Sequence, residues 1–195
     1  KIRRRSERKL IEDSKLFDGQ WYLAEYLDVA KSGVDPLMHF LVNGAKEGRD
    51  PNPLFDAQWY VDQYPEVAKA GANPLVHYID KGVALGYDPN PLFDTDWYLE
   101  KYLNNAKDNN PLTHYLSTGA AENYNPSPYF SNGYYINQNP DIAKLNINAL
   151  AHYLRRGTEW LEKIIPGSLE RGPTAPFPST LSEQSTQNQK VLFIR

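Results

Sequence analysis

Four histidines recur at a nearly constant spacing and invite a metal-site or acid–base interpretation. His39, His77, His114 and His152 follow one another at intervals of 38, 37 and 38 residues. Equivalent side chains of packed helices lie about 8 to 10 Å apart, whereas two nitrogens on one metal lie within about 4 Å of each other. The four therefore cannot share a metal. Since Leu, Tyr and Pro surround each one, we predict structural histidines, bonded to a backbone carbonyl or to a cap of the neighbouring repeat, and no metal.

Three aspartates can be paired on paper for acid–base chemistry. Asp56 and Asp94 each precede a helical pattern, where a carboxylate caps the unpaired backbone N–H groups of the first turn. Asp88 lies in a Pro-rich connector, where Asp favours turns. The sequence holds no nucleophile elbow, phosphate loop or Gly-rich dinucleotide turn. We therefore predict no catalytic residue in this chain.

Adjacent aromatic residues recur in the same way and are candidates for stacking on sugar rings. The pairs are Trp21 and Tyr22, Trp59 and Tyr60, Trp97 and Tyr98, and Tyr134 and Tyr135. Neighbouring helical residues point about 100° apart, so only one ring of each pair can lie at the centre of a buried stripe. The alternative interpretation is that these rings form the core between repeats.

The elements that position these residues form an internal repeat. Its first landmarks, Phe17, Phe55, Phe93 and Phe130, are separated by 38, 38 and 37 residues. The repeats span 16–53, 54–91, 92–128 and 129–165. A fixed period of this length is typical of stacked helical units. We predict an all-α fold of four helical repeats in a short solenoid-like array, with N- and C-terminal capping helices.

Each repeat contains recognisable helix starts and stops. Asp18, Asp56, Asp94 and Ser131 are predicted N-caps of a first helix. A short second helix over Glu66 to Lys69 ends before Gly71, and Gly33 and Asn146 occupy the same left-handed position. The third repeat is one residue shorter here, so its turn must differ. Asp35-Pro36, Asn73-Pro74 and Asn110-Pro111 start a third helix, which ends at Gly44, Gly82, Gly119 and Gly157. Pro-x-Pro connectors then lead into the next repeat as stiff, extended segments.

The ends of the chain differ from the repeats. Residues 1–15 predict a basic N-terminal helix, and residues 158–165 an amphipathic cap. Residues 166–189 have the composition of a flexible linker. Residues 190–195 read as the first strand of a following domain, cut away from this chain.

The charge distribution limits the partners. Residues 1–9 carry six basic groups against Glu7, which leaves the rest of the chain at a net charge of -8. Nucleic-acid binding needs a basic face, so we predict none. The segment from Lys1 to Lys9 is either a solvated helix start or a peripheral contact with an anionic membrane. No apolar run is long enough for a transmembrane segment.

The repeat resembles a known family through Leu54-Phe55-Asp56, Trp59-Tyr60, Asn73-Pro74-Leu75, His77-Tyr78 and Asp88-Pro89-Asn90-Pro91. These residues are similar to helical repeats of bacterial surface-polysaccharide glycosyltransferases, of the rhamnan synthesis protein F type. The resemblance spans about Leu16 to Ile165, and the fourth repeat departs from it at Tyr134, at Ala149 and after Gly157.

The resemblance implies a non-catalytic scaffold or recognition module that contacts a glycan acceptor or a partner protein. It also implies a nucleotide sugar as the cofactor of the parent enzyme only. Similar repeats occur in large secreted bacterial proteins, so the resemblance does not fix the compartment; we expect a cytoplasmic location, with the inner face of the membrane as one option. The alternative is a secreted or surface-exposed interaction array of the adhesin kind, able to bind carbohydrate.

Overall fold

The fold is all-α, as predicted. The computed structural model describes residues 2–106 and 109–155, and side chains from Arg4 onwards. Within these ranges there is no β-strand, only the isolated bridges Asn52–Phe55 and Ser127–Phe130. The chain divides into two compact units, Lys1–His152 and Tyr153–Arg195, and every contact discussed lies within the first. The predicted cap at 158–165, linker at 166–189 and strand at 190–195 lie outside the described residues.

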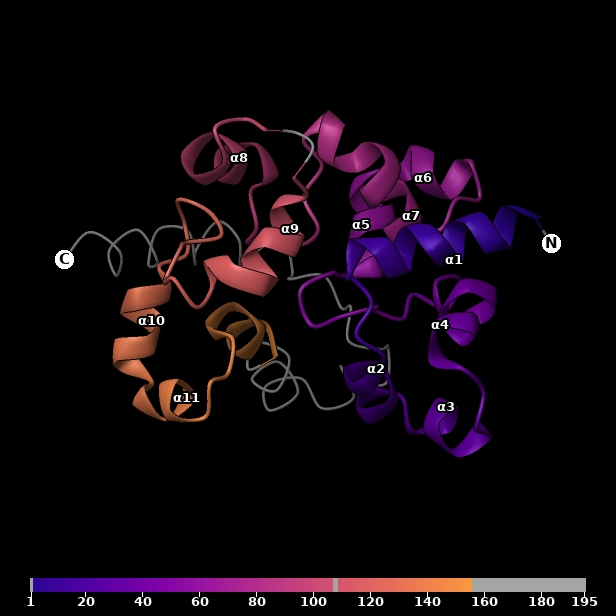
Figure 1. The fold of residues 1–195 in the computed structure, drawn as a ribbon, viewed down its shortest axis with the longest axis horizontal. Helices are drawn as coiled ribbons and strands as arrows, with labels where there is room; N and C mark the ends of the chain where they lie inside the picture. Colours follow the sequence, from indigo (N-terminus) through magenta and orange to yellow (C-terminus); the bar gives the residue numbers. More distant parts are fainter. Residues whose placement is uncertain (1, 107–108, 156–195) are drawn as a thin grey trace. The chain divides into compact units, whose positions relative to one another are not determined.

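The same helices follow one another in each sequence repeat (Figure 1). The first helices are α2 (Gly19–Glu25), α5 (Ala57–Gln63), α8 (Thr95–Leu103) and α10 (Asn132–Gln138). The second helices are α3 (Leu27–Ser32), α6 (Pro65–Lys69) and α11 (Pro140–Lys144). The third helices are α4 (Pro36–His39), α7 (Pro74–His77) and α9 (Pro111–His114), and residues 149–155 are helical in the fourth repeat. The described residues of the third repeat contain no second helix, because α8 runs on to a left-handed Asn104.

Each third helix widens into a π-helix, which the sequence does not predict. The π-helices are η1 (Phe40–Gly44), η2 (Tyr78–Gly82) and η4 (Tyr115–Gly119), and a 3₁₀ turn, η3 (Val83–Leu85), follows η2. All three π-helices end at the repeated glycine. Single π-turns inside helices are uncommon, and they mark places where a side chain must be accommodated.

The predicted caps are present. The Asp18, Asp56 and Asp94 carboxylates and the Ser131 hydroxyl accept backbone N–H groups at the start of each first helix. Asp35, Asn73 and Asn110 do the same in front of the third-helix prolines. Gly33, Gly71 and Asn146 have φ values of 68°, 58° and 52°, the left-handed conformation that ends the second helix.

Three aromatic rings form the core of each of the first three repeats. In repeat 1, Phe17 lies 5.2 Å from Tyr22 and 5.6 Å from Phe40 between ring centroids. The equivalent rings are Phe55, Tyr60 and Tyr78 in repeat 2 and Phe93, Tyr98 and Tyr115 in repeat 3, at separations of 5.2 to 6.0 Å. Such pairs are worth about 0.5–1.5 kcal/mol beyond their buried area.

The connector asparagine of repeats 1 and 2 bonds the entry segment of its own repeat. The buried Asn52 donates from Nδ2 to the Leu16 carbonyl at 2.7 Å, and Asn90 donates to the Leu54 carbonyl at 2.8 Å. The Asn52 and Asn90 amides also accept the backbone N–H two residues on. An asparagine supplies both a donor and an acceptor, so it satisfies two backbone groups that burial would otherwise leave unpaired.

A second tyrosine per repeat fixes the beginning of the connector. The hydroxyls of Tyr26, Tyr64 and Tyr102 accept the backbone N–H of residues 50, 88 and 125 at 2.8, 2.8 and 3.1 Å. Tyr87 stacks on Tyr64 and Tyr124 on Tyr102, with centroids 3.8 and 4.3 Å apart. Arg49 takes this place in repeat 1, with its guanidinium 4.9 Å from the Tyr26 ring.

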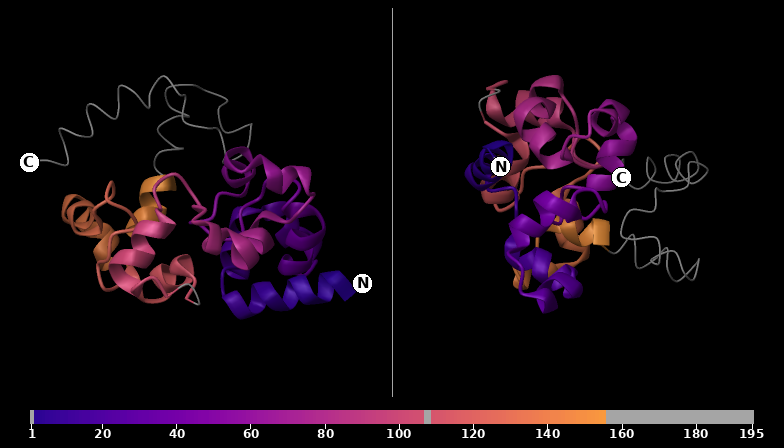
Figure 2. Two further views of the ribbon diagram at one scale, coloured as in Figure 1. Left: turned by 90° about the horizontal axis from the view of Figure 1, so that it is seen from above. Right: turned by 90° about the vertical axis from the view of Figure 1, so that its right-hand side faces the viewer.

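The N-terminal helix α1 (Ile2–Ser14) crosses several repeats, and Figure 2 shows it nearly end-on in its right-hand view. It contacts η1 of repeat 1 and both α7 and η2 of repeat 2. Ile11 is completely buried, and the Thr113 hydroxyl of repeat 3 donates to the Ser14 carbonyl at 3.0 Å. This confirms the predicted N-terminal helix and shows that it joins repeats 1 to 3.

The junctions between repeats differ in one testable way. Tyr115 donates to Asn132 of the next repeat at 2.9 Å, whereas the buried Tyr78 hydroxyl forms no hydrogen bond of good geometry among the described residues and only lies near the Thr95 side chain and the Leu112 backbone. We expect Tyr115→Phe to lower the free energy of unfolding by about 1–3 kcal/mol, because the Asn132 oxygen stays buried without its donor. Tyr78→Phe, the matched control, should be neutral or stabilising. Urea denaturation of both variants measures this, and equal losses would contradict the difference between the two junctions.

Candidate functional site

The two rings of each aromatic pair have different environments. Tyr22, Tyr60 and Tyr98 are completely buried, whereas Trp21, Trp59 and Trp97 are half-buried. Each tryptophan packs edge-on against the second tyrosine of its repeat. The centroid distances to Tyr26, Tyr64 and Tyr102 are 6.3, 6.2 and 5.7 Å. In the fourth repeat Tyr134 is 39% exposed and Tyr135 is half-buried. The first residue of each pair is therefore the one that reaches solvent, and the second belongs to the core.

The buried tyrosine bonds the histidine of its own repeat. The hydroxyl oxygens of Tyr22, Tyr60, Tyr98 and Tyr135 lie 3.0, 3.0, 2.9 and 2.8 Å from Nδ1 of His39, His77, His114 and His152. The partner thus differs from the backbone carbonyl or neighbouring cap that we expected. Burial raises the pKa of Tyr60 far above its ordinary value and lowers the pKa of His77. Both effects favour a neutral pair, which is a structural arrangement.

The repeated glycine lies directly behind the same hydroxyl. A Cβ atom built on Gly44, Gly82 or Gly119 would lie 2.1, 2.4 or 2.1 Å from the hydroxyl oxygen of Tyr22, Tyr60 or Tyr98. None of these glycines has a positive φ. Glycine is therefore required at these three positions by the close approach of the tyrosine hydroxyl. At Gly33 and Gly71, by contrast, it is the left-handed backbone that favours glycine.

Two connector carboxylates, of Asp50 and Asp88, are half-buried beside the N-caps. Asp50 accepts the Ala57 N–H and Asp88 the Thr95 N–H, both at 2.7 Å. Desolvation, with the nearby Asp56 charge, raises the pKa of Asp50. Desolvation likewise raises the pKa of Asp56 to about 6 and that of Asp88 to about 6.

Perturbed carboxylates often mark active sites, but the junction between repeats 3 and 4 supplies a different explanation here. Asn125 replaces Asp88 and accepts the Asn132 N–H at 3.0 Å, and Ser131 replaces the capping Asp94. An amide and a hydroxyl make the same bonds without an ionisable proton. The hydrogen bond is therefore what the framework requires at these positions.

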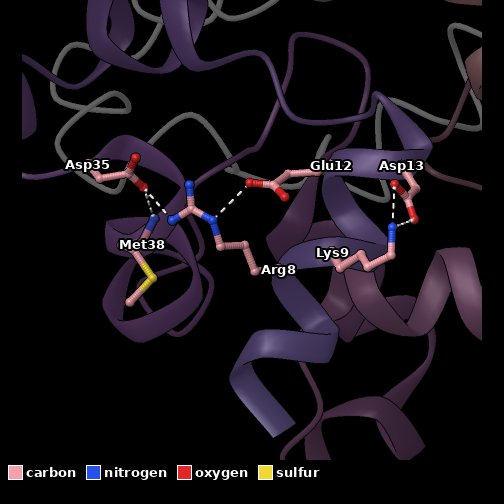
Figure 3. Close-up of polar contacts among 6 residues, drawn as sticks. All are labelled: Arg8, Lys9, Glu12, Asp13, Asp35 and Met38. Carbon is pink, nitrogen blue, oxygen red and sulfur yellow. Dashed lines mark hydrogen bonds and ion pairs between the residues drawn. The ribbon is translucent and has the colours of Figure 1, made fainter. Parts of the chain in front are cut away.

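The basic N-terminal segment is partly neutralised. Arg8 bonds Glu12 at 2.8 Å and Asp35 at 3.2 Å, and Lys9 bonds Asp13 at 2.9 Å (Figure 3). The Arg8–Asp35 pair links α1 to the cap of α4, where Asp35 also accepts the Met38 N–H. Arg4 and Arg5 are exposed. Pairing of Arg8 and Lys9 reduces the charge that this segment can offer to an anionic surface.

A groove beside the end of α1 was not predicted from the sequence. It has a volume of about 540 Å³ and is bordered on one side by Asn110, Thr113, His114 and Ser117 of repeat 3. These residues are spaced as one face of a helix, which is the signal that sequence reasoning could have used. The predicted aromatic candidates do not line it.

The comparisons with known proteins add no family to this picture. No protein-family model, curated protein or solved structure matches the chain at a significant level. Among residues 2–106 and 109–155, no group of three or more His, Cys, Asp or Glu side chains is placed to hold a metal ion. Over the same part of the chain, no helix combines the length and apolar character needed to cross a membrane.

The raised pKa values of the half-buried Asp50 and Asp88 predict how the free energy of unfolding changes with pH. A pKa raised on folding means that the folded chain binds more protons, so the free energy of unfolding falls as the pH rises from about 4 to 7. We expect the double variant Asp50→Asn, Asp88→Asn to be more stable than the parent by about 1–3 kcal/mol at pH 7, after allowance for partial solvation, with a shallower slope. Chemical denaturation across this pH range measures both.

Asp28→Asn is the matched control for this experiment. Arg49 lowers the pKa of the exposed Asp28 to about 2, so its contribution is present above about pH 4 and is lost as the pH falls through 2. This variant should leave the slope between pH 4 and 7 unchanged. A parent slope that persists in the double variant would contradict the role given to Asp50 and Asp88.

Proposed function

We propose that this chain is a non-catalytic recognition module that binds a glycan for a bacterial surface-polysaccharide glycosyltransferase. The observation that carries the proposal is that the histidines and connector aspartates, which could do chemistry, make hydrogen bonds within the fold instead. The four histidines each bond a tyrosine, and Asp50 and Asp88 bond backbone N–H groups, as Asn125 does without a charge. These groups stabilise a framework, so chemistry belongs elsewhere in the parent protein.

The repeated half-buried tryptophan supports a glycan as the ligand. Trp21, Trp59 and Trp97 occupy one position of successive repeats, and the exposed Tyr134 continues the series. Aromatic rings held at the surface by packing present a rigid apolar face at low entropic cost. A series of such rings matches a polymer of repeating sugar units, because weak contacts on one chain add through effective concentration. The glycosyltransferase context rests on the sequence resemblance.

A protein partner is the second candidate, in a secreted or surface-exposed array. Large apolar side chains favour it: Leu27 is 62% exposed, Leu145 69% and Tyr129 72%. Exposed apolar groups gathered into a patch mark interaction sites, whereas single ones are ordinary on protein surfaces. The glycan proposal is preferred because the tryptophans keep one register through three repeats.

Acrylamide quenching of tryptophan fluorescence tests the glycan proposal. The experiment uses a Trp160→Phe variant, so that the fluorescence comes only from Trp21, Trp59 and Trp97. Purified bacterial surface polysaccharide should protect these rings from the quencher in a saturable way. Replacing all three by Phe should weaken polysaccharide binding, measured by sedimentation, by at least about tenfold. Unchanged quenching and no cosedimentation would contradict the proposal, and capture of a protein partner instead would favour the second candidate.

A further inference from the structure

The groove at the end of α1 combines a polar wall with an apolar one. Leu10 of α1 and Ile79 and Val83 of repeat 2 form the apolar wall, and the facing wall is the polar helix face of repeat 3. Its volume of about 540 Å³ is that of a small-molecule site. All of these residues lie within the first compact unit.

The polar wall is particular to repeat 3. Thr113 occupies the position held by Met38 in repeat 1 and Val76 in repeat 2. Ser117 occupies the position held by Val42 in repeat 1 and Asp80 in repeat 2. The repeat framework does not require a hydroxyl at either position, since it accepts Met and Val there. Among repeats 1 to 3, hydroxyls occur at these two positions only in repeat 3, where Thr113 donates to the Ser14 carbonyl and Ser117 borders the groove.

Two groups of the polar wall are fixed in orientation. Tyr98 bonds Nδ1 of His114 at 2.9 Å, so the ring can bond a ligand only through Nε2. Asn110 accepts the Thr113 N–H through Oδ1, and its Nδ2 is buried with no partner among the described residues. The Nδ2 of Asn73, the equivalent cap of repeat 2, is in the same state, so this orientation belongs to the Asn cap.

The charge of the groove favours a neutral ligand. Asp13 borders it, but its carboxylate bonds Lys9 at 2.9 and 3.2 Å (Figure 3). No lysine or arginine lines the groove in the described part of the chain, so a phosphate would have no counter-charge. Hydroxyl, amide and imidazole groups both donate and accept hydrogen bonds, as the hydroxyls of a sugar do, and the apolar wall suits its C–H face.

We propose that this groove binds a neutral saccharide, with His114 and Ser117 bonding its hydroxyls and Leu10, Ile79 and Val83 contacting its apolar face. This site rests on the proposed function, because it locates one sugar unit of the recognised glycan. It lies apart from the half-buried tryptophans, none of which borders the groove.

Side-chain NMR of the full 195-residue chain tests the site. The probes are maltotriose, cellotriose, mannotriose and triacetylchitotriose, each titrated to about 10 mM, above the millimolar constants of weak binding. At least one should shift the Thr113 and Val83 methyl signals and the His114 ring signals in a saturable way. Saturable shifts confined to the tryptophans, or none with any probe, would overturn the proposal.

Two neighbouring exposed positions supply the matched variants. Ser117→Arg should fill the groove and weaken binding by at least about tenfold, whereas Thr118→Arg, one residue on and outside the groove, should bind like the parent. The methyl spectra of both variants should otherwise match the parent, which shows that they fold. Equal affinities for Ser117→Arg and the parent would overturn the site. Polysaccharide protection of the tryptophans would still stand in that case, so failure of the groove and failure of the proposed function are distinguishable.

Discussion

The structure depends on one contact in each of the first three repeats, where a buried tyrosine hydroxyl lies between a histidine and a glycine. Tyr60 illustrates it: its hydroxyl is 3.0 Å from Nδ1 of His77 and occupies the space that a Cβ on Gly82 would take. The tyrosine comes from the first helix, and the histidine and glycine come from the third. The contact therefore sets how close the two helices approach, and the three-ring core forms at that distance.

The connectors close each of the first two repeats on its own entry segment. Asn52 and Asn90 return to the carbonyls of Leu16 and Leu54, so each entry segment is bonded by the connector that follows its repeat. Helix α1 adds a longer-range contact by reaching Ser14 to Thr113 of repeat 3. The price of this framework is that most of its polar residues are committed to hydrogen bonds. Function is then left to side chains that the framework uses only in part, such as the half-buried tryptophans.

Much of the local structure could be predicted from the sequence, because caps and turns depend on near neighbours. Asp18, Asp35 and Asn146 act as the N-caps and the left-handed helix end that their residue types indicate. The partner of His77 could not be predicted, since it depends on a contact between residues 17 positions apart. The sequence correctly places Gly82 at the end of a helix. The reason for a glycine there, however, is the close approach of the Tyr60 hydroxyl. Pattern alone does not distinguish a glycine needed for φ from one needed for space.

The candidate site was less predictable for the same reason. The aromatic pairs could be found by their register, but which ring is buried depends on the packing of three helices. The groove depends on α1 lying beside repeat 3, and no local pattern encodes that neighbour. The polar face at Asn110, Thr113 and Ser117 was visible in the sequence, yet its meaning requires the apolar residues that face it.

The most direct test of the tyrosine–glycine contact is a double-mutant cycle of Gly82→Ala with Tyr60→Phe. Gly82 has helical angles, φ -57° and ψ -46°, so alanine alone would stabilise an unobstructed helix by up to about 1 kcal/mol. We predict instead that Gly82→Ala lowers the free energy of unfolding in the parent, and that this loss shrinks or reverses once Tyr60→Phe removes the hydroxyl. Stabilisation by Gly82→Ala in the parent, or an equal loss in both backgrounds, would contradict the account.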